Sequence, residues 1–154
     1  MKKFLMISGI VFWVLILIIA AFFIWGIHLD ATSKSFVDQN VPVIVSNWSE
    51  QELLKKASIE LKAIASNERA DKTWTGFTKL GVLKKYNGSK GRSNQNAIFL
   101  PGKDGRIGYE VTAKYVAEAD FQNGSAKITI DLIRQNGEWK FFSFDVDSPF
   151  TKNN

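Results

Sequence analysis

The distribution of apolar and polar residues divides the chain into an anchor, a helical part and a strand-rich part. From Phe4 to Ile27 the chain holds 24 residues without a charge. A helix of that length extends roughly 36 Å, which exceeds the ~30 Å hydrocarbon core of a bilayer. The run therefore predicts one membrane-spanning helix, and we assign residues 1–28 to this anchor.

The stretch after the anchor keeps apolar residues at helical spacing. Between Ala31 and Val45 this spacing indicates that the membrane helix could continue outward, although Pro42 would kink or divide it. Ser49 and Glu52 then form a capping box, which predicts a new helix beginning at Glu50.

Two further helical stretches follow the capping box. Leu53 to Ala65 has one apolar face, including Ile64, and could be interrupted near Ser58. A further helix is expected after Asn67, with Ala70, Trp74, Phe77 and Leu80 inward and Gly81 closing it.

After Gly81 the period changes from helical to alternating, which predicts strands. Asn123-Gly124 and Asn136-Gly137 have the composition of tight hairpin turns, so the strands form an antiparallel meander. We expect strands at 82–93, 109–121, 126–132 and 139–146, with 94–106 as a glycine-bearing connection.

The last strand contains a break in its alternation. Trp139 and Phe141 have one parity, whereas Phe142, Phe144 and Val146 have the other. A β-bulge near Phe141 and Phe142 would let both sets reach the core.

Charge and composition add a topology and remove several classes of chemistry. Lys2 and Lys3 precede the apolar run, so the positive-inside rule places the N-terminus in the cytoplasm and the domain outside. A cysteine-free domain that faces outward favours a bacterial envelope, so we expect the bacterial inner membrane. The chain has no cysteine, which excludes disulfides, thiolate zinc sites and a cysteine nucleophile. The net charge of +5 is too mild and too dispersed to indicate nucleic acid as a partner.

Four segments of the domain resemble those of a known superfamily: Phe77–Leu83, Tyr115–Gly124, Gly137–Lys140 and Phe144–Ser148. They resemble the cystatin-like, or nuclear transport factor 2-like, superfamily, and especially its bacterial one-helix membrane proteins of unassigned function. The resemblance implies an α+β domain at 29–150, with helices packed on a curved antiparallel four-stranded sheet, and a tail at 151–154. It also implies that the hollow between sheet and helices serves as a pocket or a docking surface, and that a homodimer could form through the sheet.

Two sets of residues are candidate binding sites. An apolar hollow would serve a small-molecule carrier or sensor, and it would be lined by Trp74, Phe77, Tyr109, Tyr115 and Trp139. Two glycine-rich basic turns could form a patch for anionic headgroups or an acidic partner, and it would comprise Lys84, Lys85, Lys90, Arg92, Lys103 and Arg106.

Catalytic chemistry has few candidates in this sequence. The one histidine, His28, falls at the membrane boundary, and Asp145 and Asp147 are interpreted as a solvated face. No pattern indicates a metal or a cofactor, and neither basic turn has the spacing of a phosphate-binding loop. The sequence therefore favours a non-catalytic binding or assembly module, with another envelope protein as partner.

Overall fold

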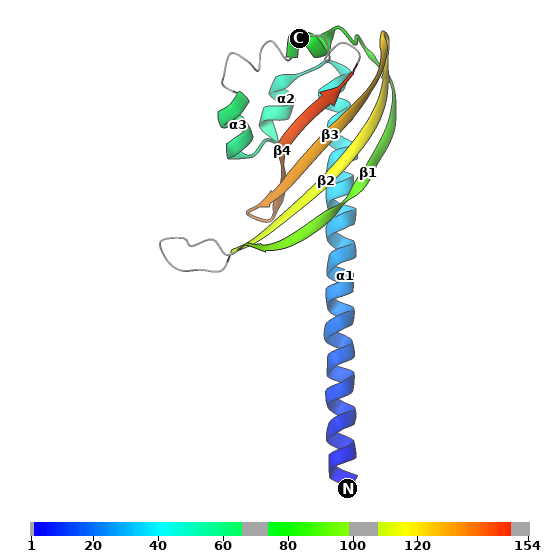
Figure 1. The fold of residues 1–154 in the computed structure, drawn as a ribbon, viewed down its shortest axis with the longest axis vertical. Helices are drawn as coiled ribbons and strands as arrows, with labels where there is room; N and C mark the ends of the chain where they lie inside the picture. The colour runs from blue at the N-terminus through cyan, green and yellow to red at the C-terminus, as the bar shows by residue number, and fades with distance from the viewer. Residues whose placement is uncertain (1, 66–73, 99–107, 149–154) are drawn as a thin grey trace.

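The computed structural model describes residues 2–65, 74–98 and 108–148, and the side chains of 11–65, 74–94 and 110–148. The fold is α+β: one long helix carries a four-stranded antiparallel sheet in the order β1-β2-β3-β4 (Figure 1). The helices are α1 (Lys2–Ser46), α2 (Glu50–Lys55) and α3 (Ile59–Ala65), with a short helix at 74–78. The strands are β1 (Leu83–Ile98), β2 (Gly108–Phe121), β3 (Gly124–Gln135) and β4 (Glu138–Asp147).

The anchor and the stretch beyond it form one continuous helix. α1 contains 45 residues and runs through position 28, where we placed the domain boundary, and through Pro42. The expectation that Pro42 could divide the helix was therefore wrong. Val41, Ile44 and Val45, on both sides of the proline, are at most 1% exposed, so packing against the sheet supports the turn that lacks a backbone hydrogen bond.

The two halves of α1 face different surroundings. Every side chain from Val11 to Trp25 is exposed, and α1 is the one described helix long and apolar enough to cross a membrane. Burial begins at Leu29 and recurs every three or four residues, which defines one helix face toward the sheet. This buried face comprises Leu29, Ser33, Val37, Val41, Ile44 and Val45.

The N-cap at Ser49 and the break at Ser58 are confirmed, but the capping box is only half formed. Ser49 N–H donates to Ile44 O, and the Glu52 carboxylate pairs with Lys55. Ser49 Oγ accepts a hydrogen bond from the Glu52 backbone N–H at 3.3 Å, and Ser58 Oγ accepts one from Leu61 N–H at 3.2 Å. Between the two helices the chain pairs with β4, because Phe141 N–H donates to Lys56 O and Ser58 N–H donates to Phe141 O.

This pairing resets the orientation of α3 relative to the preceding helix. Ile64, which we expected inward, is 64% exposed, so that prediction was wrong. None of the residues of α3 is buried.

β1 is longer than the alternation predicted. Asn94 to Ile98, expected in a connection, pair with Thr112 to Gly108 of β2. Backbone hydrogen bonds extend the strand pairing there, although no apolar alternation in the sequence predicts it. The rest of the expected connection, 99–106, and the tail at 151–154 lie outside the described residues.

The hairpin turn at Asn136-Gly137 and the bulge in β4 are confirmed. The first hairpin turn lies one residue earlier than expected, because Phe121 pairs with Gly124 and the two loop residues are Gln122 and Asn123. Asn136 and Gly137 have φ values of 53° and 83°, as a two-residue hairpin turn requires. Asp131 pairs with Ser143 whereas Leu132 pairs with Phe141, which leaves Phe142 as the extra residue. Phe141 is consequently 0% exposed and Phe142 44% exposed.

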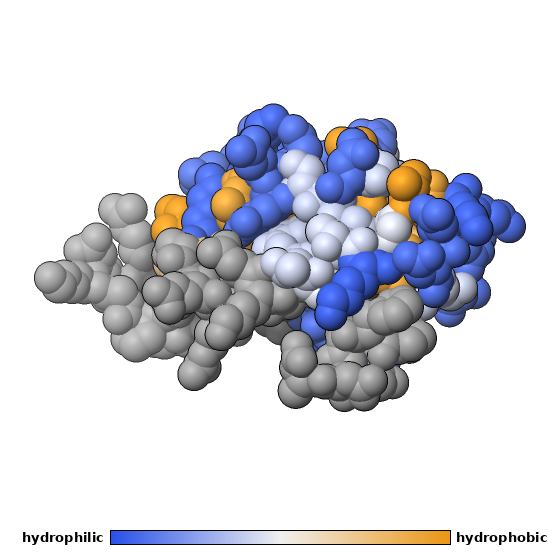
Figure 2. Space-filling model, turned by 90° about the horizontal axis from the view of Figure 1, so that it is seen from above, coloured by the Kyte–Doolittle hydropathy of each residue, from blue (hydrophilic) through white to orange (hydrophobic). Residues whose placement is uncertain are grey.

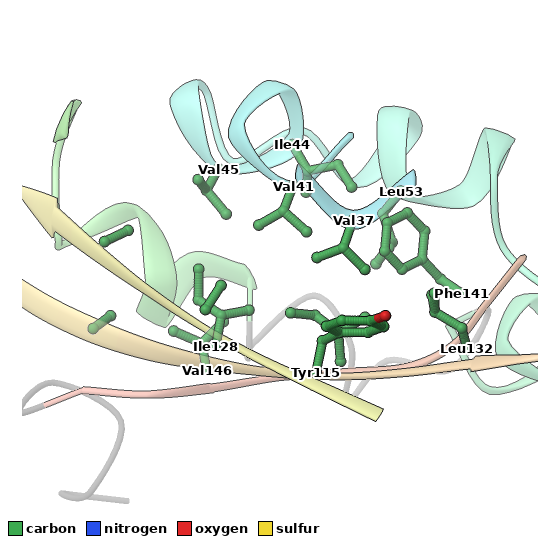
Figure 3. Packing of buried hydrophobic residues seen from close by; sticks show 14 of the residues in the cluster. Val37, Val41, Ile44, Val45, Leu53, Tyr115, Ile128, Leu132, Phe141 and Val146 are labelled. Atoms are coloured by element: carbon green, nitrogen blue, oxygen red, sulfur yellow. The ribbon is translucent and has the colours of Figure 1, made fainter. Parts of the chain in front are cut away.

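The core lies between α1 and the inner face of the sheet (Figure 3). Val37, Val41 and Ile44 of α1 face Tyr115 and Ile128 of the sheet in this view. At the end away from the apolar run, Trp48 stacks on Phe121 at 5.0 Å and packs on Phe77 at 5.5 Å.

The short helix ends as expected. Leu80 is buried, and Gly81 follows it with φ of +78°, a conformation that favours glycine. Ala70, which we expected inward, is outside the described residues.

Candidate functional site

Three of the five residues predicted to line a hollow belong to the packed core. Phe77, Tyr115 and Trp139 are 4%, 1% and 7% exposed. Trp74 is partly buried and contacts Phe77 edge-on at 5.6 Å. Tyr109 lies in β2 opposite Ala97, and its side chain is outside the described set.

Helix α1 lies beside Tyr115 and Trp139 and binds their polar atoms. The Tyr115 hydroxyl is hydrogen-bonded to Ser33 Oγ at 2.8 Å and donates to the Asp30 carbonyl at 3.2 Å. Trp139 Nε1 donates to Thr32 Oγ1 at 3.1 Å. Tyr115 and Trp139 therefore mark the end of the domain nearest the apolar run, whereas Trp74 and Phe77 lie at the other end with Trp48.

Two aspartates of α1 hold the edge strand β1. Ser93 N–H donates to Asp30 Oδ1 at 2.6 Å, and Ser89 N–H donates to Asp38 Oδ1 at 3.0 Å. The eight-residue step from Asp30 to Asp38 rises about 12 Å along the helix, and the four-residue step from Ser89 to Ser93 spans about 13 Å along the strand, so the two spacings match. The carboxylates satisfy backbone donors on a sheet edge that would otherwise be open to pairing with another chain.

We call the contact of Asp30 and Asp38 with β1 the seam along α1. Its electrostatics keep Asp38 ionised. Burial opposes its charge, but hydrogen bonds from Lys34, Ser89 and Tyr86 outweigh burial and lower the pKa of Asp38 below its usual 3.8. Burial, and then the adjacent Asp38 carboxylate, raise the pKa of the Tyr86 phenol. Burial also raises the pKa of Tyr115.

The outer face of the sheet, turned away from α1, carries a groove of about 930 Å³. Its charged lining is Lys90 and Arg92 from β1, Lys114 from β2 and Asp131 from β3, and Phe142 of the bulge also lines it. Lys114 Nζ lies 3.3 Å from Asp131 Oδ1. Within the described part of the chain, neither Lys90 nor Arg92 forms an ion pair.

A second groove of about 610 Å³ lies on the same face at the far end of the strands. Its charged lining is Glu118, Asp120, Asp147 and Lys127. Hydrogen bonds from Ser125 and Asn87 lower the pKa of Asp120, so this carboxylate is ionised at neutral pH. The first groove thus has three basic residues to one acidic, and the second has the reverse.

The predicted basic patch is divided by the structure. Lys90 and Arg92 line the first groove, whereas Lys84 and Lys85 lie at the opposite end of β1. Lys103 and Arg106 are outside the described residues. Sequence reasoning missed Lys114, which the strand register sets opposite Arg92.

The other charged candidates are dispersed. His28 is exposed on α1, and Asp145 and Asp147 are both exposed on β4. Within residues 2–65, 74–98 and 108–148, no three histidine or carboxylate side chains gather as a metal site would require. Seen from the end opposite the apolar run, the described surface is mostly hydrophilic, with apolar residues in small patches (Figure 2).

Comparisons with protein-family models, with curated proteins and with solved structures find no match to this chain. The arguments for function therefore come from the sequence, the fold and the two grooves.

Proposed function

We propose that this chain is a single-pass protein of a bacterial cytoplasmic membrane that holds a non-catalytic binding domain against the outer surface of the bilayer. The observation that carries the proposal is α1, which is at once the apolar segment and the central helix of the core. Two lysines precede the apolar run, which supports a cytoplasmic N-terminus.

The position of the domain follows from the length of α1. The apolar run ends at Ile27, and Leu29, the first buried side chain of the core, is two residues or about 3 Å farther along the helix. A domain attached in this way works on molecules at the membrane surface.

We also propose that the domain is of the cystatin-like type, in which the hollow between sheet and helices serves as a pocket or a docking surface; the packing of one helix on an antiparallel meander supports this. Here the inner face of the sheet is covered by α1, so the outer face is the surface available to a partner. We assign this outer face to the binding of another envelope protein.

The placement of the phenols supports a binding role over catalysis. The hydroxyls of Tyr86 and Tyr115 are engaged by Asp38 and by Ser33, respectively, and both groups face α1. Neither tyrosine contributes to the lining of the two outer grooves.

Cysteine labelling tests the topology, because the chain has no cysteine of its own. We expect a membrane-impermeant maleimide to label Ser125→Cys in intact cells and to label Lys3→Cys only after lysis. The reverse result would refute the assigned orientation.

Site-specific photo-crosslinking tests the binding surface. A photoreactive residue at Thr129, on the outer face between the grooves, should capture a defined partner. The matched control is Val43, which is 52% exposed on α1. A product of twice the chain mass would identify a second copy as the partner, and recovery of the lone chain from both positions would contradict the proposal.

A further inference from the structure

One end of the first groove lies at the height where α1 leaves its apolar run. Ser93 donates its N–H to Asp30, which is three residues, or about 4.5 Å, beyond Ile27. Arg92 and Lys114 face each other across β1 and β2 next to this contact. A headgroup layer is about 5–7 Å thick on each side of the hydrocarbon core, so both residues stand level with it.

The direction of the strands agrees with this placement. In Figure 1 the ends of β1 and β2 that continue past Ser93 lie toward the apolar half of α1, and their other ends lie at the top of the domain. The first groove is therefore on the membrane side of the outer face, and the second groove is on the side away from the membrane.

The two grooves also differ in net charge. The first groove combines Lys90, Arg92 and Lys114 with Asp131, which is paired to Lys114. Glu110, which lies opposite Asn96 on the membrane side of the groove, adds one negative charge and leaves the group net positive. The second groove is net negative. The groove toward the bilayer is therefore net positive, and the groove away from it is net negative.

We propose that Arg92, Lys90 and Lys114 bind the phosphate groups of anionic lipids in the leaflet from which the domain emerges. The Arg92 guanidinium can engage two phosphate oxygens at once, and the two ammonium groups add compact positive charges. Arg92 and Lys114 stand level with the headgroups, which favours a lipid phosphate over a soluble one, although both share this chemistry. Lys90, beside the Ser89–Asp38 contact, lies farther from the bilayer along the direction of α1. The inference rests on the proposed membrane attachment.

Native mass spectrometry of the full chain released from nanodiscs tests the proposal. Discs of phosphatidylcholine mixed with phosphatidylglycerol supply the anionic lipid, and the measured quantity is the phosphatidylglycerol retained on the protein. The test variant is K90Q/R92Q/K114Q. The control, K84Q/K85Q/K127Q, removes three exposed positive charges from the other end of the face.

We expect the control to retain phosphatidylglycerol as the wild type does. The test variant should bind it about a hundredfold more weakly, from the usual contribution of three basic residues near an anionic surface. Since the six substituted side chains of the two variants are all exposed, both variants should melt at the wild-type temperature. This measurement separates lost binding from lost folding.

Several results would overturn the proposal. Equal retention of phosphatidylglycerol by the two variants would show that the assigned residues do not bind the lipid. Displacement of the lipid by inorganic phosphate would assign the site to a soluble phosphate. Loss of an acidic protein partner in the test variant, with lipid retention unchanged, would also overturn it. Nanodiscs expose both leaflets alike, so the lipid result is independent of the labelling experiment, and the two proposals can fail separately.

Discussion

Gly91 is the position where the sheet leaves no room for a side chain. It lies in β1 opposite Tyr115, and a Cβ there would stand 2.0 Å from the Lys114 carbonyl oxygen and 2.7 Å from Tyr115 Cα and Cδ1. Real Cβ contacts stay at 3.0 Å or more, so the two strands would have to separate by about 1 Å. Two of these three atoms belong to the backbone of a central strand, which cannot rotate aside. We expect Gly91→Ala to destabilise the domain by about 3 kcal/mol, the upper part of the usual cost of overpacking.

Thermal unfolding of the full chain in detergent, followed by tryptophan fluorescence, measures this effect. For a domain of this size the loss corresponds to a Tm decrease of roughly 10 °C. The matched control is Gly76→Ala, since a Cβ at Gly76 meets no atom within 4 Å. A helical alanine there should leave the Tm unchanged or raise it slightly. A Gly91→Ala variant that melts within about 2 °C of the wild type would refute the inferred close packing of β1 on β2.

Three further predictions follow from the seam along α1 and from the bulge. Asp38→Asn should lower the unfolding free energy at pH 7 by about 1–3 kcal/mol, because charged hydrogen bonds are lost. Since the Asp38 pKa is lowered on folding, the wild type should lose this advantage as the pH falls below 3.8. Denaturant titrations at pH 7 and pH 3 that show the same difference between wild type and variant would contradict this assignment. Tyr115→Phe should cost about 1 kcal/mol by the same measurement, a modest loss because Ser33 keeps its bond to the Leu29 carbonyl. Phe141→Ala should cost about 3–5 kcal/mol and its exposed neighbour Phe142→Ala less than about 1 kcal/mol, and equal losses would place the bulge elsewhere.

Local chemistry explains which parts of the fold could be predicted from the sequence. The cap at Ser49 and the turn at Asn136 depend on side chain and backbone preferences within a few residues. The bulge was predictable because Phe141 and Phe142 are adjacent bulky residues, only one of which can face the core. The candidate anchor was readable because an uncharged run of that length is rare in soluble domains.

Long-range pairing explains what could not be predicted. Asp30 and Asp38 read as ordinary polar positions of a helix, and their function in holding β1 depends on where the edge strand lies. Lys114 joins Arg92 through the register of β1 and β2, which the alternation alone does not give. Apolar periodicity marked the ring of Tyr115 as inward but did not identify α1 as its neighbour.

The unbroken course of α1 has a mechanical consequence. A helix longer than the local hydrocarbon thickness adjusts to a thinner bilayer by tilting. Since α1 has no hinge between its apolar half and Leu29, and the sheet is packed along its second half, the sheet must lean by the same angle as the helix. In the proposed membrane-attached protein, bilayer thickness would thereby set how closely the first groove approaches the lipid surface, and the tilt of the sheet would vary with the membrane around it.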